Sequence, residues 1–342
     1  MAVLVMNVHG FLSMTVAAVR EDRRMREYGL NLELDVQAAA GTEVTDIVAG
    51  WFDEASAGAL SEPRRALETD GPPPAAPQFV DPGSWNPAGA PVHLAGTLSV
   101  SGRRAKAFDG KAIAWLRDRL ADDPERVELR FALFAGNEPD APNVWYPSLY
   151  AHRPEDSPGW LRIGAYVAEK IFLDPMHGAE AQRLWLGVLR EFAHRLNPGF
   201  GQVEYGFDTS GKTALEWSFP PAIPLEERDP EYTVAQSRQH LRGYSWVTVV
   251  PEELANRLGG VAALEGSGAF VEVTALRNGG VWLLATPDYR DYGPEQVERV
   301  FQVLAPVLRP GRPELRDYVL GDPPPRRVVL QDAAVASGRA TS

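Results

Sequence analysis

The stretch Gly243–Pro306 predicts a complete folded unit: GYSWVTVVPEELANRLGGVAALEGSGAFVEVTALRNGGVWLLATPDYRDYGPEQVERVFQVLAP. It begins with a run typical of a β-strand, Tyr244–Val250, which ends at Pro251. Proline costs nothing at the first position of a helix, where its missing N–H would have no partner. The pair Gly259 and Gly260 favours a left-handed stop, so we expect one strand followed by one short helix.

The second part of this stretch predicts a hairpin followed by a longer helix. Asn278 and Gly279 form the strongest short hairpin signal, between the strands Phe270–Leu276 and Val281–Leu284. Pro294 favours the start of the last helix. The apolar stripe of that helix consists of Val297, Val300, Phe301, Leu304 and Val307. The order β-α-β-β-α indicates an α+β unit.

Several short runs in this region carry a resemblance to a known family. They are Gly243–Trp246, Pro251–Leu254, Leu258–Gly260 and Gly279–Leu284. Together they resemble the C-terminal half of the type VI immunity family, mainly over residues 241–310. Members of that family neutralise nuclease toxins of the VRR-NUC type, so the resemblance implies an α+β immunity protein with a toxin as its partner. The shared residues specify a fold more than an activity.

The composition limits the classes of partner and chemistry. The 342 residues include 46 acidic and 34 basic side chains, for a formal net charge of −12. This balance argues against direct nucleic-acid binding, which needs a basic surface. It fits a basic protein partner, although an acidic surface also serves solubility. The chain has no cysteine, which excludes disulfides, thiol catalysis and zinc–thiolate sites.

The N-terminal stretch, residues 1–24, is apolar but does not match a targeting segment. It has no positive residue ahead of its apolar part, and Asn7 and His9 interrupt it. A secretory signal needs the charged leader, and a membrane-spanning helix needs a longer apolar run. We therefore expect a first strand in a cytoplasmic protein without a membrane segment.

The overall pattern predicts an α+β protein of two loosely similar halves, with mixed or antiparallel sheets and helices packed on one face. The N-terminal half covers residues 1–196 and the C-terminal half covers residues 197–310. Residues 68–91 contain seven prolines and predict a long loop. Residues 311–342 are rich in proline and arginine, and we expect a poorly ordered tail.

Two segments have especially clear periodicity. In Tyr28–Val36, leucine and valine alternate strictly with Asn31, Glu33 and Asp35, which predicts a half-buried strand. The segment Ala179–Leu196 predicts the best helix of the chain. Its apolar face consists of Trp185, Val188, Leu189, Phe192 and Leu196.

The stretch Gly206–Thr213 matches the phosphate-binding pattern GxxxxGK[ST]. In a true P-loop the threonine begins a helix whose N-terminus faces the phosphates. Here apolar and polar residues alternate through residue 219, and the preceding residues 203–207 alternate too. The pattern therefore favours a hairpin that turns at Ser210 and Gly211, whereas a helix directly after the stretch would favour a nucleotide site.

The remaining chemistry-bearing residues predict no catalytic residue, metal site or cofactor. The six histidines are scattered, with no pair at a spacing typical of metal ligands. Ser267 lacks the strand–turn–helix context of a nucleophile elbow. Asp288 and Asp291 could do acid–base work, but their neighbours are more typical of a surface loop before a helix.

Aromatic and acidic groups are better candidates for recognition than for chemistry. Exposed tyrosine and tryptophan are typical interface anchors, although such residues can equally fill a core below a loop. An acidic run would complement a basic nuclease, although charge runs are usually solvated. The candidate partner-binding residues are Trp145, Tyr146, Tyr150 and Trp160 in a loop-like segment, Glu226, Glu227, Asp229 and Glu231 in an irregular connection, and Asp288, Tyr289, Asp291 and Tyr292.

Three functions follow from these observations. The leading hypothesis is a non-catalytic immunity protein that neutralises a cognate toxin, with a basic nuclease as the simplest partner. The second is a nucleotide-dependent enzyme that uses residues 206–213. The third is a scaffold or regulator with a protein partner unrelated to toxins. A toxin gene beside this one would separate the first from the third.

Overall fold

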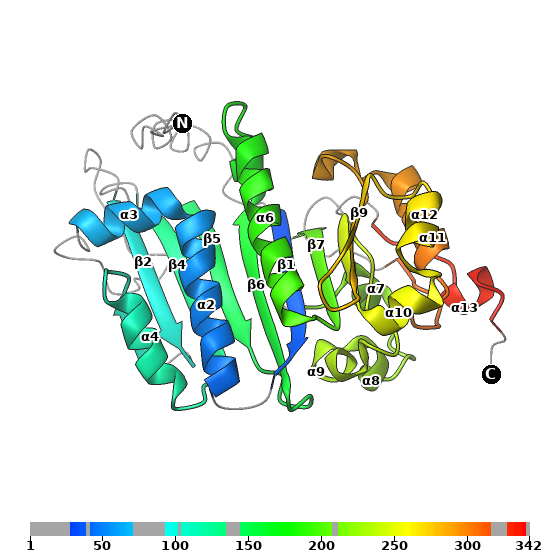
Figure 1. Ribbon diagram of the computed structural model, residues 1–342, viewed down its shortest axis with the longest axis horizontal. Coiled ribbons are helices and arrows are strands. Elements are labelled where there is room, and N and C mark those ends of the chain that lie inside the picture. The colour runs from blue at the N-terminus through cyan, green and yellow to red at the C-terminus, as the bar shows by residue number, and fades with distance from the viewer. Residues whose placement is uncertain are drawn as a thin grey trace. The chain divides into compact units, whose positions relative to one another are not determined.

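The computed structural model describes seven stretches of the chain: residues 28–38, 42–70, 93–101, 104–134, 144–206, 211–315 and 327–339. The expected N-terminal strand lies outside them, as does the proline-rich stretch from residue 71 onward. The chain forms two compact units (Figure 1). The first contains the described residues within 45–150, and the second contains those within 28–44 and 151–339. Residues 28–44 thus belong with the C-terminal part, and the division differs from the expected boundary near residue 197.

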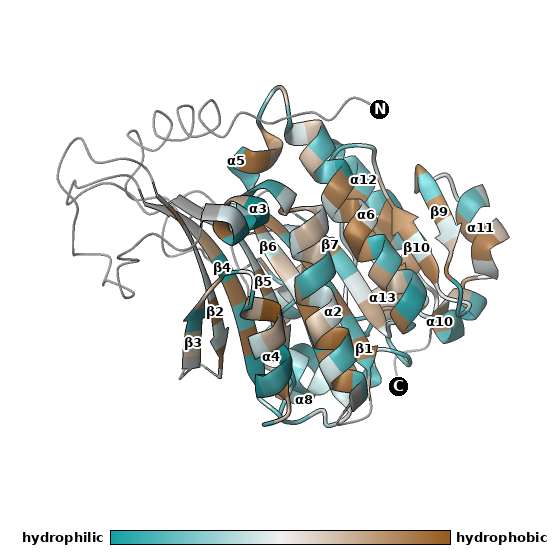
Figure 2. Ribbon diagram, turned by 60° about the vertical axis from the view of Figure 1, so that its left-hand side comes forward, coloured by the Kyte–Doolittle hydropathy of each residue, from teal (hydrophilic) through white to brown (hydrophobic). Residues whose placement is uncertain are grey.

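The first unit combines antiparallel strands with three helices. The strands follow the order β3 (Arg104–Ala107), β2 (His93–Val100), β4 (Arg126–Phe134) and β5 (Val144–His152). The helices are α2 (Thr42–Gly58), α3 (Ser61–Asp70) and α4 (Ala112–Leu120), and both α3 and α4 contact β2. Trp51 and Phe52 of α2 are fully buried, as the grouping of apolar residues in that helix predicts. In Figure 2, α2 and α4 carry both apolar and hydrophilic bands.

The second unit is built on six strands in the order β6 (Trp160–Ala168), β1 (Gly29–Gln37), β7 (Phe200–Gly206), β8 (Val247–Val250), β10 (Val281–Leu284) and β9 (Glu272–Ala275). Every pair of neighbours in this order is antiparallel. The long helix α6 (Gly178–Leu196) follows the short α5 (Glu169–Phe172) and contacts β1. The α+β class expected from the sequence is confirmed.

The stretch Gly243–Pro306 folds largely as expected. It forms β8, α10 (Glu252–Arg257), β9, β10 and α12 (Pro294–Leu304), and the apolar stripe of α12 is buried. Gly259 and Gly260 both have positive φ, of 88° and 74°, and they connect α10 to a helix the sequence did not indicate, α11 (Gly260–Gly266). Pro251 stands one residue before α10 instead of opening it.

Strand β1 departs from the prediction of a half-buried strand. Its leucines and Val36 are buried, as expected, but Asn31, Glu33 and Asp35 are buried as well. Both faces of this strand are therefore covered. A polar side chain in such a position needs partners from other elements.

Two further expectations are corrected by the structure. The aromatic segment before residue 153 was expected to be a loop, but Val144–His152 is strand β5. The tail was expected to be poorly ordered, yet residues 327–339 are described and contain α13 (Ala333–Ala336). Within this segment Arg339 donates hydrogen bonds of 2.9 Å to the carbonyls of Ala305 and Leu308. In the part of the chain that the structure describes, no helix is long and apolar enough to cross a membrane.

Candidate functional site

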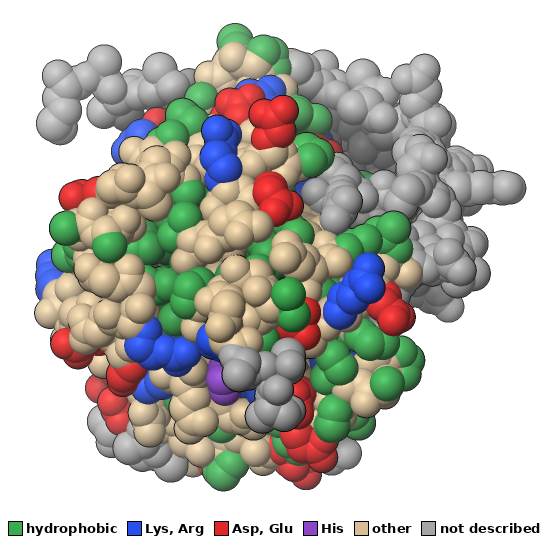
Figure 3. All heavy atoms as spheres, turned by 90° about the vertical axis from the view of Figure 1, so that its right-hand side faces the viewer, with side chains coloured by type: hydrophobic (Ala, Val, Ile, Leu, Met, Phe, Trp, Pro, Cys, Tyr) green, Lys and Arg blue, Asp and Glu red, His purple; other side chains and the backbone are tan. Residues whose placement is uncertain are grey.

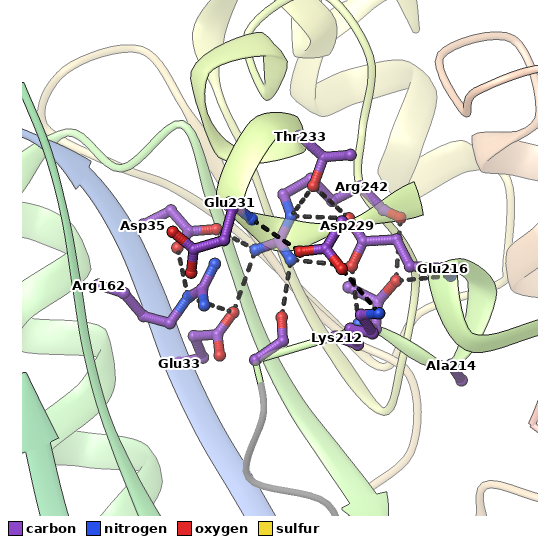
Figure 4. A network of polar contacts seen from close by, with 12 residues as sticks. Glu33, Asp35, Arg162, Lys212, Ala214, Glu216, Asp229, Glu231, Thr233 and Arg242 are labelled. Carbon is purple, nitrogen blue, oxygen red and sulfur yellow. Dashed lines mark hydrogen bonds and ion pairs between the residues drawn. The ribbon is translucent and has the colours of Figure 1, made fainter. Parts of the chain in front are cut away.

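A fully buried arginine, Arg242, lies at the centre of a polar network in the second unit (Figure 4). Its guanidinium donates to both carboxylates of β1, with 3.2 Å to Glu33 Oε1 and a very short contact to Asp35. It also donates to Glu216, at 3.0 Å from Nε and 2.8 Å from Nη2, and to the carbonyl of Gly211 at 2.7 Å. One side chain thus joins the sheet to residues 211–216.

A second buried arginine, Arg162 of β6, reaches the same carboxylates. Its Nε lies 3.0 Å from Asp35 Oδ1 and 3.3 Å from Glu33 Oε1. Asp35 and Arg162 are direct cross-strand partners in the β1–β6 pair, which places their side chains on the same face. Buried charges of this kind are tolerated only when they are paired and hydrogen-bonded.

The network contains more carboxylates than guanidiniums. Glu33, Asp35 and Glu216 face two arginines, and burial raises the pKa of Glu33 to about 7 despite the opposing charge of Arg162. Burial likewise raises the pKa of Glu204, on neighbouring β7, to about 8, while a hydrogen bond from Ala214 N opposes this shift. Protonation of these groups near neutral pH relieves the excess negative charge.

The same network fixes a short helix, α7 (Ala214–Ser218). Thr213 caps it by accepting from Glu216 N, and Glu216 accepts from Thr213 N in return. Thr233 donates to the other oxygen of Glu216 at 2.5 Å. The expected strand after Thr213 is therefore wrong, because the capping box and the burial of Glu216 beneath Arg242 outweigh the two-residue alternation.

The P-loop-like stretch serves this local structure. A helix does follow Thr213, as a nucleotide site would require, but it has only five residues. Its first N–H groups are bonded to carboxylates, since Ala214 N donates to Glu204 and Thr213 N to Glu216. Lys212 Nζ lies 2.8 Å from Asp229 Oδ2. Among the described residues of the stretch, Lys212 Nζ and the N–H of Thr213 are thus engaged by the protein's own side chains, as is the N–H of Ala214 that follows; residues 207–210 lie outside the described part.

Gly211 has a reason to be glycine that needs no phosphate. Its φ is +76°, and a Cβ there would lie 2.1 Å from Arg162 Nη1. A larger residue would therefore be strained and would collide with the buried guanidinium.

The acidic run lies on two short helices instead of the expected irregular connection. They are α8 (Leu225–Arg228) and α9 (Pro230–Thr233). Glu226 is exposed, while Glu227, Asp229 and Glu231 are partly exposed. Asp229 caps α9 by accepting from Glu231 N. Glu231 accepts from Glu155 N at 2.8 Å and lies 3.0 Å from His152 Nε2, so it links α9 to residues 152–155 of the same unit.

The aromatic candidates are less accessible than an interface role requires. Tyr150, Trp160, Tyr289 and Tyr292 are all buried, so of the two interpretations that the sequence left open the core position describes them. Tyr289 stacks on Tyr205, with ring centroids 5.7 Å apart. It also donates to Glu169 at 3.1 Å.

The other candidates in these two segments have different positions. Trp145 and Tyr146 belong to β5, and their side chains lie outside the described part of the structure. Asp288 is bonded to Arg290 N and pairs with the Arg290 guanidinium at 2.6 Å, which lowers the pKa of Asp288. Asp291 is exposed. Within the described residues, no group of three or more His, Asp or Glu side chains is placed to hold a metal ion.

Comparisons with known proteins give little beyond this geometry. No protein-family model matches the chain, and no curated protein matches it. Among solved structures, it is similar to the Pseudomonas aeruginosa T6SS protein PA0821, with 15% sequence identity and a TM-score of 0.49. The similarity covers 92% of this chain and 87% of that chain. Function must therefore be argued from the residues themselves.

Proposed function

We propose that this chain is a non-catalytic immunity protein that binds a cognate toxin and blocks it by steric and electrostatic occlusion. The simplest partner is a basic nuclease. The observation that carries the proposal is the fixed acidic surface on α8 and α9. The formal net charge of −12 and the resemblance over residues 241–310 support it as well.

The acidic surface is held rigidly by the buried network. Arg242 donates to Glu216 of α7 and to Thr233, whose Oγ1 lies 3.1 Å from Arg242 Nε. These contacts attach both ends of residues 211–233 to β1. A charged surface that is fixed before binding steers an oppositely charged partner and loses little entropy on association.

Two of the four acidic candidates are suited to meeting a partner. Asp229 and Glu231 are engaged within the protein by Lys212, His152 and backbone N–H groups. Glu226 and Glu227 make no side-chain hydrogen bond or ion pair with the residues that the structure describes. Their charges are therefore available to an incoming cation.

Four charged groups of this unit, two buried and two partly exposed, hold its structure together. Arg242 joins β1 to α7, Glu216 caps α7, and Lys212 pairs with Asp229. This use of the charged residues supports a binding role over the nucleotide-dependent alternative.

The test is protection of growing cells against the product of the adjoining gene. The variant Glu226→Lys/Glu227→Lys should lose protection, because it reverses one exposed and one partly exposed charge and leaves the network intact. The matched control is Glu265→Lys/Glu295→Lys, which makes the same charge change at exposed positions elsewhere in this unit. An adjoining product that neither inhibits growth nor binds this chain would remove the proposal, and equal protection by both variants would remove its electrostatic part.

A further inference from the structure

Two large apolar side chains are exposed within the segment that the buried network anchors. Trp217, in α7, is 39% exposed and Leu225, at the start of α8, is 48% exposed. Pro221 and Ala222, between them, are exposed as well. Exposed apolar side chains scattered singly need no explanation, so the question is whether these two lie together.

The contacts of Lys212 link Trp217 to the helix that begins with Leu225. Its Nζ lies 5.3 Å from the centroid of the Trp217 ring and 2.8 Å from Asp229 Oδ2. Asp229 N in turn donates to the carbonyl of Leu225 at 2.8 Å, one helical turn away. Helices α7 and α8 are also in contact. Trp217 and Leu225 therefore belong to one local surface.

A buried side chain and backbone hydrogen bonds hold the segment between Trp217 and Leu225. Phe219 is fully buried, and the carbonyl of Ser218 accepts from Glu314 N at 2.7 Å. Arg228 Nε donates to the carbonyl of Ile223 at 2.7 Å. The exposure of the two apolar side chains thus belongs to a packed part of the molecule.

Acidic side chains from two segments of the chain come together at Tyr232 of α9, the helix that follows α8. Glu226 and Glu227 follow Leu225 directly. The turn after β5 contributes Glu155 and Asp156, both exposed. Tyr232 of α9 hydrogen-bonds Asp156, whose charge raises the pKa of that tyrosine. Figure 3 shows acidic side chains along the lower part of the face it presents, and α8 and α9 lie at the lower edge in Figure 1.

We propose that this acidic–apolar patch, made of Trp217, Leu225, Glu155, Asp156, Glu226 and Glu227, is the surface on which the partner docks. Its occupant is a basic polypeptide segment that places an apolar side chain against Trp217 and Leu225 and its lysines or arginines against the surrounding carboxylates. The inference rests on the proposed function, which it refines by naming the surface and the chemistry of the partner.

The arrangement matches the known anatomy of protein interfaces. Tryptophan is enriched among the residues that dominate binding, and a surrounding rim excludes water from them. Here four acidic side chains, Glu155, Asp156, Glu226 and Glu227, outnumber the nearby cations Lys212 and Arg228, and Lys212 is already paired with Asp229. The excess of negative charge selects against acidic partners and increases the association rate of basic ones. An apolar centre without the acids would not discriminate in this way.

A short amphipathic peptide of alternating lysine and leucine is the first probe, titrated into the full chain by calorimetry. We expect saturable binding that Trp217→Ala/Leu225→Ala weakens about tenfold or more, as expected for loss of a central anchor. The control Val271→Ala/Val335→Ala removes apolar side chains that are 57% and 60% exposed elsewhere, and it should bind as the native chain does. A peptide of alternating glutamate and leucine should not bind.

The patch is ruled out if the lysine peptide fails to bind the native chain, or if both double variants bind it equally. The adjoining gene product provides the second measurement, by calorimetry on the same variants. Tight binding of that product that Trp217→Ala/Leu225→Ala does not weaken would overturn the surface and leave the proposed function. Peptide binding at the patch without any binding of the adjoining product would remove the toxin partner and leave the surface.

Discussion

The two faces of strand β1 are both buried, yet different forces hold them. Leu30, Leu32 and Leu34 lie on one face of the strand and are buried, and there burial of apolar area is sufficient. Glu33 and Asp35 point the other way and are buried against two guanidiniums. The apolar face tolerates substitutions of similar shape. The ionic face depends on each partner, because the loss of one leaves a buried charge alone.

The largest effect is expected when the ionic face loses its centre. Arg242→Ala removes the cation that Glu33, Asp35 and Glu216 share and leaves these carboxyl groups buried, so we expect a loss of about 3–5 kcal/mol in the free energy of unfolding. Urea denaturation measures it. The control, Arg290→Ala, removes a more exposed pair with Asp288 and should cost about 0–1 kcal/mol. Equal losses for both variants would show that the buried network contributes no more than a surface pair.

Removal of Arg242 should also loosen residues 211–233, the segment that carries the proposed binding surface. Without it, α7 and Thr233 lose their link to β1, so residues 211–233 should exchange amide hydrogens faster. Faster exchange limited to β8 and β10 would contradict the anchoring role.

The next effect is a dependence of stability on pH, which we expect from the ionic face of β1 and not from its apolar face. The pKa of Glu33 is raised from 4.5 to about 7 in the folded protein, mainly by burial. The folded state therefore keeps a proton that the unfolded state releases near pH 4.5. The contribution of Glu33 to stability is fully present below that pH and is lost as the pH rises to about 7.

The variant Glu33→Gln tests this sign. It stays neutral, so its stability relative to the native chain should increase between pH 5 and pH 7, by up to about 1.4 kcal/mol per pH unit. Urea denaturation at several pH values gives the difference directly. Glu298→Gln, at an exposed position, is the control and should show no such trend. A difference for Glu33→Gln that does not vary with pH would mean that this carboxyl is ionised throughout.

The same contrast explains what the sequence could and could not predict. The strands and helices of residues 243–306 follow from local signals such as Asn278 and Gly279, because both turn chemistry and apolar periodicity act over a few residues. The burial of Glu33 and Asp35 depends on Arg242, more than two hundred positions away in the chain. Alternation alone cannot distinguish a solvated polar face from one covered by cations.

The sequence likewise predicted only part of the candidate site on α7, α8 and α9. The acidic run was visible, but its anchoring through Glu216 was not, because the alternation after Thr213 favoured a strand. The alternation placed Trp217 in that strand, whereas in the structure it belongs to the capped helix α7, which contacts α8. The one available signal was the capping-box spacing of Thr213 and Glu216.

The smallest effect concerns Lys212, on which the anchoring and nucleotide hypotheses differ. Its ammonium pairs with Asp229 and lies over Trp217, both at partly exposed positions. Lys212→Ala should therefore cost only about 0–1 kcal/mol in the free energy of unfolding. Lys111→Ala, at an exposed position in the first unit, is the control.

Titration with a fluorescent ATP analogue discriminates between the anchoring and the nucleotide hypotheses. We expect no saturable binding to the native chain, because Glu204 and Glu216 accept from the N–H groups of Ala214 and Thr213, which are then not available to phosphate. Saturable binding that Lys212→Ala abolishes would reverse the assignment, and residues 206–213 would then be a nucleotide site.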